Sequence, residues 1–385
     1  MIMVMRRFLL CSAFLLILCQ SEGSDPPDPP KILSSLYGYN DCIGGVNNFD
    51  TEEEYLEELR RRNCTVENGR TNVVSSTMIS LRCFAWFNPL SWLDGMPVVF
   101  NYPLDGTPSY DDFEVELSDG TKITPDCILL GPADEQNELD TALLLGQFGD
   151  GPLDTLKPVR VTVVGDVNVV NDEGVLVNAK GVTYSNDVDM NYVSSTVRLV
   201  TAKMWDVNVL PEDFHYPLWP LPSQVKYILI IYTCLTFCSQ VYPNDCVSLY
   251  PNTTHVIRAT FSGGVTTDGI APIMPSNRNV FRVSRSIDSS DIVYLGLADL
   301  GQTTGEDVTD DYDYKQDGDN YVDICFDLTD NLEVLEDGVS LEVLCDETLD
   351  KSQLYPPKGK PYSCKYQNVF LSKSSKPNLV LLWSS

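Results

Sequence analysis

The densest run of acidic side chains, residues 306–327, carries the kind of ligand that a hard cation prefers. Carboxylate oxygens are the usual protein ligands of Ca²⁺, and Gly318 allows a sharp turn within the run. The candidate metal ligands are Asp310, Asp311, Asp313, Asp317, Asp319 and Asp323. Counted from Asp311 as the first position of an EF-hand loop, the run has Gln316 where glycine is needed. Counted from Asp313, it has Gly318 at that position but Lys315 at a ligand position, and both registers lack the bidentate glutamate. We therefore expect weak or distributed Ca²⁺ binding, and the alternative is a solvated acidic loop that only keeps the protein soluble.

Residues 110–119 form a second acidic patch, in which apolar and acidic residues alternate. This alternation is typical of a half-buried strand, and it places Asp112, Glu114 and Glu116 on the outward face. The ordinary solvent face of a strand explains the pattern. The patch still adds carboxylates to the surface.

Catalytic residues are scarce in this sequence. Histidine occurs only at His215 and His255, and we expect both to be structural. General acid–base schemes therefore have few candidate bases. The sequence has no nucleophile elbow, zinc-protease motif, phosphate-binding glycine loop or dinucleotide fingerprint. We do not expect an enzyme, although a carboxylate-pair hydrolase would leave no distinctive pattern among so many acids.

The charge balance favours cationic partners. The chain has 55 acidic and 26 basic residues, which gives a formal net charge of −29. Such a charge repels nucleic acid and attracts cations, basic proteins and cationic mineral surfaces. With 43% hydrophobic and 10% aromatic residues, the chain can bury a core, and its length suits two. It is therefore not a disordered polyanion.

The N-terminus has the pattern of a secretory signal peptide, residues 1–23. The basic pair Arg6-Arg7 precedes an apolar stretch, residues 8–19, that is too short to span a bilayer. Cleavage is expected after Gly23. We therefore expect a secreted protein without a transmembrane anchor.

The chain has 12 cysteines, and an even number remains outside the signal peptide. Such a set in a secreted chain predicts disulfide bonds. Zinc binding is the alternative, but the closest pair, Cys234 and Cys238, lacks the tight spacing of a zinc site. The disulfide candidates outside that pair are Cys42, Cys64, Cys83, Cys127, Cys246, Cys325, Cys345 and Cys364. Their pairing stays open.

Two Asn-x-Thr triplets, at Asn63 and Asn252, are acceptors for N-linked glycans. Asn252 is the better candidate, because a disulfide at Cys64 would restrict access to Asn63. Beside a signal peptide, the triplets agree with a secreted glycoprotein.

The mature chain begins with a Pro-rich leader, residues 24–37. Proline fixes φ and lacks an N–H, so the leader is expected to be extended. One short helix is expected at residues 50–62, where Asp50 can cap the first turn. Glutamates lie four residues before Arg61 and Arg62 and can pair with them along the helix.

The rest of the chain has the pattern of short β-strands. Valine-rich runs are separated by Gly, Asn and Asp turn signals, and this spacing favours β-sandwiches over parallel α/β sheets. The expected strands cover residues 159–164, 167–170, 174–183, 196–201, 255–261, 280–283, 292–297 and 339–344.

An aromatic and proline-rich stretch at residues 211–222 divides the chain into two blocks. We expect an N-terminal β-rich domain at residues 38–210, a linker at 211–240, and a C-terminal β-rich domain at 241–385 that carries the acidic loop. Within the linker, residues 225–240 are apolar and nearly uncharged. A buried strand explains this segment. A translated intron is the alternative. Ser-Gln precedes the segment and also ends it, a valine codon begins with the two bases of a splice donor, and a glutamine codon can end with those of an acceptor.

Three motifs resemble those of the acid-rich skeletal organic matrix proteins of stony corals. They are Gly45-Val46-Asn47-Asn48-Phe49-Asp50, Leu295-Gly296-Leu297-Ala298-Asp299-Leu300, and Asp317-Gly318-Asp319-Asn320-Tyr321-Val322-Asp323 before Cys325. The likeness extends over most of the mature chain. It implies a role in skeleton formation, in which acidic side chains bind Ca²⁺ and calcium carbonate. This chain lacks the long poly-Asp tracts of the most acidic members, so the likeness supports matrix membership more than crystal nucleation.

We therefore expect a mainly β, disulfide-bonded protein of two β-sandwich-like blocks with one short N-terminal helix. Its expected function is that of a secreted acidic skeletal matrix protein that binds Ca²⁺ and calcium carbonate mineral, alongside other matrix proteins. The competing hypothesis is an extracellular adhesion or carbohydrate-binding module whose acidity serves solubility.

Overall fold

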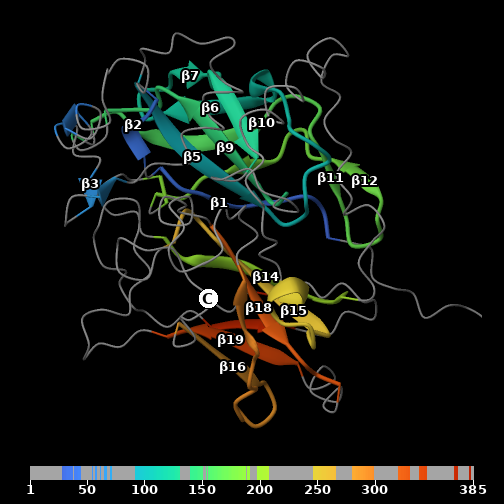
Figure 1. The fold of residues 1–385 in the computed structure, drawn as a ribbon. Coiled ribbons are helices and arrows are strands. Elements are labelled where there is room, and N and C mark those ends of the chain that lie inside the picture. The colour runs from blue at the N-terminus through green and yellow to red at the C-terminus, as the bar shows by residue number, and fades with distance from the viewer. Residues whose placement is uncertain are drawn as a thin grey trace, which may run out of the picture.

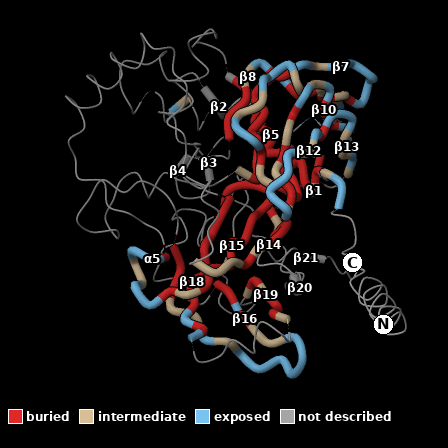
Figure 2. Tube along the Cα trace, turned by 90° about the vertical axis from the view of Figure 1, so that its right-hand side faces the viewer, coloured by how far each residue is buried: buried red, intermediate tan, exposed pale blue. Residues whose placement is uncertain are grey.

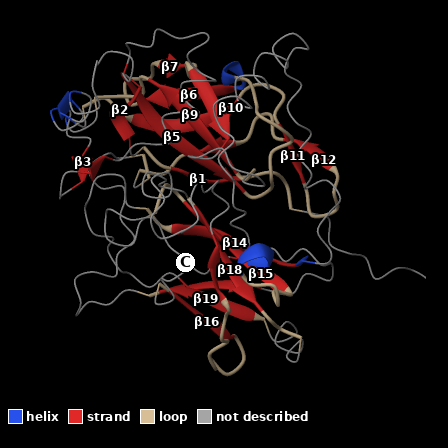
Figure 3. Cartoon of the chain, viewed as in Figure 1, coloured by secondary structure: helices blue, strands red, loops and turns tan. Residues whose placement is uncertain are grey.

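In the computed structural model, two groups of antiparallel strands contain most of the described strands (Figure 1). Strands dominate, with turns and loops between them (Figure 3). The mainly β fold expected from the sequence is thereby confirmed. The structure describes residues 28–37, 39–44, 54, 57, 58, 61, 65–66, 70–71, 92–130, 139–150, 153, 155–187, 189–190, 197–207, 246–265, 280–298, 320–329, 338–344, 368–371 and 381–382.

The first group, here the first sheet pair, consists of two sheets. One has the order β1-β5-β9-β8, with β2 also paired to β5, and the other has the order β13-β10-β6-β7. The strands of the former are β1 (Ile32–Ser35), β2 (Tyr39–Gly44), β5 (Trp92–Phe100), β8 (Cys127–Leu130) and β9 (Thr141–Gly146). Those of the latter are β6 (Phe113–Leu117), β7 (Lys122–Ile123), β10 (Pro158–Val163) and β13 (Thr183–Tyr184).

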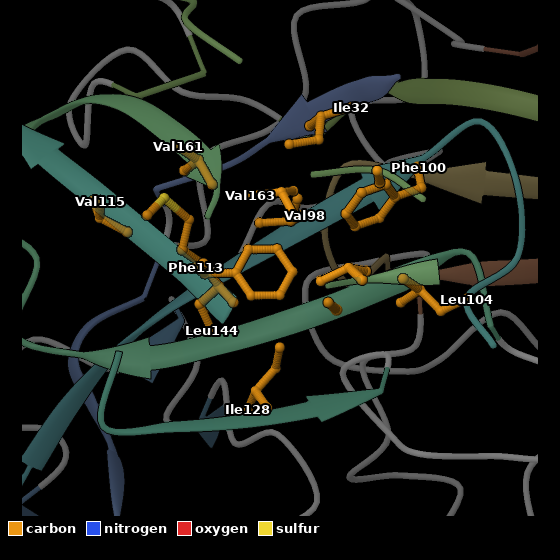
Figure 4. Packing of buried hydrophobic residues seen from close by; sticks show 14 of the residues in the cluster. Ile32, Val98, Phe100, Leu104, Phe113, Val115, Ile128, Leu144, Val161 and Val163 are labelled. Atoms are coloured by element: carbon orange, nitrogen blue, oxygen red, sulfur yellow. The ribbon is translucent and has the colours of Figure 1, made fainter. Parts of the chain in front are cut away.

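Alternate residues of these strands fill the core between the two sheets. Phe113 and Val115 of β6 pack in one cluster with Val98 and Phe100 of β5, and all four are buried (Figure 4). Figure 2 shows that β5 is largely buried. The rings of Phe100 and Phe113 meet edge-on, with centroids 6.4 Å apart. Full burial of one such side chain stabilises a fold by about 1.5–3 kcal/mol, so this core holds the two sheets together.

The second group, here the second sheet pair, also consists of two sheets, with the orders β14-β15-β18-β17 and β16-β19-β20-β21. The strands of the former are β14 (Leu199–Asp206), β15 (His255–Phe261), β17 (Gly296–Ala298) and β18 (Tyr321–Phe326). Those of the latter are β16 (Phe281–Arg285), β19 (Val339–Val343), β20 (Asn368–Leu371) and β21 (Leu381–Leu382). Phe261, Ile324, Phe281 and Leu341 are part of their common core.

Two small sheets and a 3-10 helix complete the described elements. A hairpin joins β11 (Asn168–Val170) to β12 (Leu176–Asn178), and β3 (Thr65–Val66) pairs with β4 (Arg70–Thr71). The 3-10 helix η2 (Tyr110–Asp112) precedes β6.

The helix whose two ends are described is α5 (Cys246–Leu249), which lies in the second half of the chain. This short helix is not N-terminal, and it was not expected from the sequence. A four-residue helix is too short to be stable alone, and a disulfide at Cys246 ties α5 to β18. Within residues 50–62, the positions 54, 57, 58 and 61 are described and helical, and Arg61 bonds Glu58, three residues earlier.

Two strands pair with strands outside the segment to which the sequence assigns them. β14 lies within residues 38–210, yet it pairs with β15 from Leu199↔Phe261 to Asp206↔His255 and so belongs to the second sheet pair. β1 lies within the Pro-rich leader and pairs with β5. The signal peptide and the linker at 211–240 are outside the described residues.

Buried polar groups join the two sheet pairs. Thr141 Oγ1 of β9 accepts hydrogen bonds from Asn320 Nδ2 at 3.0 Å and from the Tyr321 hydroxyl at 2.9 Å. Lys203 Nζ of β14 donates to Asp140 Oδ1 at 2.6 Å. These contacts place β18 and β14 against the first sheet pair.

Candidate functional site

The expected metal-binding run is described only at its end. Asp323 lies within β18, and the other candidate ligands are outside the described residues, so their role stays a prediction. Those candidates are Asp310, Asp311, Asp313, Asp317 and Asp319.

Asp323 is buried and paired with Arg258. Its two carboxylate oxygens accept hydrogen bonds from Arg258 Nε at 2.8 Å and Nη2 at 2.9 Å, and 6% of each side chain is exposed. Strand register explains the pair, because the two residues lie directly opposite each other on β15 and β18. The guanidinium also lies 5.3 Å from the ring centre of Trp205 and 5.6 Å from that of Tyr321, at distances where a ring face attracts a cation. Both oxygens of Asp323 are thus bonded to Arg258, and its expected role as a Ca²⁺ ligand stays a prediction.

Three exposed aspartates share one turn geometry, in which a serine or threonine follows two residues later. The backbone N–H of that residue donates to Oδ1 at 2.8 Å for Asp119, 2.9 Å for Asp288 and 3.1 Å for Asp327. The hydroxyls of Ser290 and Thr329 donate to the same oxygen at 2.6 Å. These bonds all go to Oδ1, and the charge of Arg285 also acts on Asp288.

These hydrogen bonds lower the pKa of the three carboxyl groups. The backbone N–H of Thr121 is the main cause at Asp119, and the hydroxyl two residues on is the main cause at Asp288 and Asp327. Hydrogen bonds to a carboxylate favour its charged form. The three side chains therefore stay ionised at a lower pH than a free aspartate would.

The three turn aspartates are spread over the molecule. Asp119 lies in the turn between β6 and β7 of the first sheet pair, Asp288 follows β16, and Asp327 follows β18. They do not form one cluster. In the described part of the chain, no three His, Cys, Asp or Glu side chains come close enough together to hold a metal ion.

The acidic face of β6 is neutralised by neighbouring cations. Lys122 Nζ lies 2.8 Å from a carboxylate oxygen of Glu114, and Arg160 Nη1 lies 3.1 Å from one of Glu116. Asp112 accepts a hydrogen bond from the backbone N–H of Ser109, which precedes η2. Burial alternates along β6 as expected, but this face is not a row of free carboxylates.

The expectation of disulfide bonding is confirmed. Cys246 and Cys325 form a disulfide that ties α5 to β18, and Cys127 is also disulfide-bonded. The candidates whose side chains are not described are Cys42, Cys64, Cys83, Cys345 and Cys364.

One of the two candidate glycan acceptors and one of the two histidines are among the described residues. Asn252 is exposed in the turn between α5 and β15, whereas Asn63 is outside the described residues. His255 begins β15 and is buried. Burial lowers its pKa, and the negative charge of Asp206 opposes that shift. His215 is outside the described residues.

The turn aspartates carry a sequence signal. Aspartate two residues before serine or threonine commonly bonds the backbone of a turn. The pattern is short and occurs by chance, so it needs the strand ends beside it to be recognised.

Comparison with models of known protein families, with curated proteins and with solved structures finds no match. In the ranges that the structure describes, no helix is long and apolar enough to cross a membrane.

Proposed function

We propose that this chain is a secreted acidic matrix protein that binds Ca²⁺ and calcium carbonate mineral through carboxylates spread over two β-sandwich-like blocks. The observation that carries the proposal is the set of exposed turn aspartates, Asp119, Asp288 and Asp327, whose pKa values are lowered. The hydrogen bonds within these turns go to Oδ1 of each carboxylate. A cation or a cationic crystal plane is the chemical partner of carboxylate oxygens.

The position of these aspartates favours distributed binding over one defined site. They occupy separate turns of the folded chain. The turn between β6 and β7 and the turn after β16 lie at opposite ends of the molecule (Figure 1), so one flat mineral surface meets only some of these carboxylates at a time. Extracellular Ca²⁺ sites typically have dissociation constants of about 10⁻⁴–10⁻³ M. We therefore assign this protein weak affinity for free Ca²⁺ and many simultaneous weak contacts with a crystal, which together bind more strongly than any one contact.

Two properties of the sequence support the same reading. The net charge of −29 is far larger than solubility requires. The motifs that resemble acid-rich skeletal matrix proteins of stony corals imply the same partner, calcium carbonate, and a location in the skeletal matrix with other matrix proteins.

A carbohydrate-binding module would need exposed aromatic rings as stacking platforms. Among the described aromatic side chains, Tyr110 is half exposed, whereas Trp205 is partly buried with the guanidinium of Arg258 over its ring. This alternative has less support than mineral binding.

The proposal is tested by calorimetric titration of the mature chain with Ca²⁺. The turn variant Asp119→Asn/Asp288→Asn/Asp327→Asn keeps the acceptor oxygens of the turns and removes three charges. The control Glu114→Gln/Lys122→Gln removes one ion pair and leaves the net charge unchanged. We expect the turn variant to bind fewer Ca²⁺ ions than the wild type and the control to match the wild type.

Two results would count against this. If the turn variant binds as many ions as the wild type, the turn aspartates are not ligands. If the wild type binds no Ca²⁺ at millimolar concentration, the calcium proposal is wrong.

The acidic run needs a separate variant, in which Asp311, Asp313, Asp317 and Asp319 are changed to Asn. Asp323 is left intact because its loss would unpair Arg258. A loss of one tight binding event in this variant would show a defined site in the run, and a small graded loss would support distributed binding.

A further inference from the structure

We propose that Asn252 carries an N-linked glycan and that this asparagine is an acceptor only before β18 joins the sheet. The side chain of Asn252 is exposed in the turn between α5 and β15. The triplet Asn252-Thr253-Thr254 has the acceptor pattern. A glycan at this turn extends into solvent and displaces no packed side chain.

In the folded protein, the hydroxyl that the glycosyl transferase must recognise is already hydrogen-bonded to other residues of the chain. The transferase binds the hydroxyl of the third residue of the triplet, here Thr254. In the structure, that hydroxyl accepts a hydrogen bond from the backbone N–H of Leu328 at 2.8 Å and donates to the carbonyl of Phe326 at 3.4 Å. It is therefore held by the end of β18.

The backbone around the acceptor is fixed as well. The Thr254 N–H donates to the Phe326 carbonyl at 2.8 Å, and the Thr254 carbonyl accepts from the Val207 N–H at 3.0 Å. The Thr253 hydroxyl is bonded to the carbonyls of Cys246 and Tyr250. An extended acceptor peptide cannot leave this position for a transferase site without breaking these bonds.

Asn252 is synthesised before β18, so there is an interval in which glycosylation can occur. Thr254 and Phe326 are separated by 72 residues, and the disulfide that secures β18 spans 79 residues. At about 5–20 residues per second, the chain between them takes roughly 4–14 s to make. During that time the triplet has no β18 to bind.

The reaction itself is a transfer from a lipid pyrophosphate oligosaccharide. A bond forms between Asn252 Nδ2 and C1 of the first sugar, and the bond from C1 to the pyrophosphate oxygen breaks. The electron pair of that bond leaves with the pyrophosphate, and the amide proton passes to a base of the transferase.

The site is tested in the chain secreted from eukaryotic cells, with Asn63→Gln present throughout so that one acceptor remains. We expect one glycan on Asn252 by peptide mass mapping. It should be lost in Asn252→Gln and in Thr254→Val, and retained in Thr254→Ser, which keeps the hydroxyl. A secreted chain without a glycan at Asn252 overturns the site.

The timing is tested with unglycosylated full-length chain, purified transferase and the lipid-linked donor. We expect the reduced, unfolded chain to be modified at Asn252 and the folded, disulfide-bonded chain to remain unmodified. Equal modification of the two forms overturns the requirement that glycosylation precede folding. Failure to modify the unfolded chain overturns the assignment of Asn252 as an acceptor.

Discussion

Asp323 and Asp327 are close in sequence and lie in opposite surroundings. Asp323 is buried and bonded through both oxygens to Arg258, whereas Asp327 is exposed and bonded through one oxygen to Thr329. In the sequence the two aspartates belong to the same acidic run. Alternation does not separate them, because they are four residues apart and would share one face of a strand. What separates them is that β18 ends at Phe326 and that Arg258 lies opposite Asp323 on β15, because register decides which residues meet.

We expect Asp323→Asn to lower the free energy of unfolding by about 3–5 kcal/mol, because removal of one partner leaves a buried charge uncompensated. The matched change Asp327→Asn affects an exposed residue and should alter stability by less than about 0.5 kcal/mol. Urea denaturation of the two variants measures the difference. A stable Asp323→Asn protein that has lost Ca²⁺ binding would instead support Asp323 as a ligand.

His255 makes the stability of the protein depend on pH. Burial lowers its pKa below the unfolded value of about 6.5. As the pH falls through about 6.5, the unfolded chain takes up a proton at this site before the folded protein does, so the folded state loses stability. The loss continues until the pH falls below the pKa of the folded state.

We therefore expect the free energy of unfolding to decrease between about pH 7 and about pH 5, and His255→Gln to flatten this decrease. His215→Gln, at the other histidine of the chain, is measured alongside to show how much of the slope each histidine contributes. Chemical denaturation at a series of pH values measures both. An unchanged slope in His255→Gln would contradict the assignment.

At the scale of elements, the two ends of the connection from β14 to β15 lie next to each other in the sheet. The strands pair up to Asp206↔His255, and the Val207 N–H bonds the Thr254 carbonyl just beyond that pair. The two ends of the connection are thus held together by the sheet, whatever the length of chain between them. The apolar segment at residues 225–240 lies within this connection.

We expect deletion of residues 225–240 to leave the fold intact. Shortening the connection by about a third changes the loop-closure free energy by only about 0.4 kcal/mol. The deletion also removes Cys234 and Cys238 together, so the number of cysteines stays even. Thermal unfolding and disulfide mapping of the deletion variant check this, with the pair Cys246–Cys325 expected to remain. Failure to fold would show that the segment is part of the core, and sequencing of the transcript would test whether it is a translated intron.

Several strands could be predicted because their residues alternate or are β-branched, as in β6, β10 and β15. β5 could not, since Pro97 and Gly95 interrupt it and proline is unusual within a sheet. The structure supplies the reason that Pro97 is tolerated. On that edge of β5, β1 pairs with Val98–Phe100 and β2 pairs with the segment up to Gly95, so Pro97 lies where one partner strand gives way to the other.

At the scale of the whole molecule, the two sheet pairs are connected by contacts between residues far apart in sequence. The Tyr321 hydroxyl reaches Thr141 across 180 residues. Asp189 accepts hydrogen bonds from Ser34 beside β5 and from Arg198 at the entry to β14. Sequence patterns predict the layers but not such contacts, because no local periodicity records them.

The negative charge of the whole molecule is divided between carboxylates in ion pairs and carboxylates in turns. Glu114, Glu116, Asp140, Asp189 and Asp323 form ion pairs with cations. The turn aspartates are held mainly by hydrogen bonds, with the charge of Arg285 also acting on Asp288. In the described part of the chain, the carboxylates proposed to bind cations therefore lie in turns at strand ends. The carboxylates on strand faces contribute less, because cations already pair with them.

Adsorption of the mature chain to calcium carbonate crystals tests the central claim most directly. We expect saturable adsorption that weakens strongly as NaCl is raised from about 0.1 M to about 1 M, over which the Debye length falls from about 10 Å to about 3 Å. The variant Asp119→Asn/Asp288→Asn/Asp327→Asn should adsorb less than the wild type, and Glu114→Gln/Lys122→Gln should adsorb equally. Absence of wild-type adsorption, or adsorption independent of both salt and the turn aspartates, would contradict binding through distributed carboxylates.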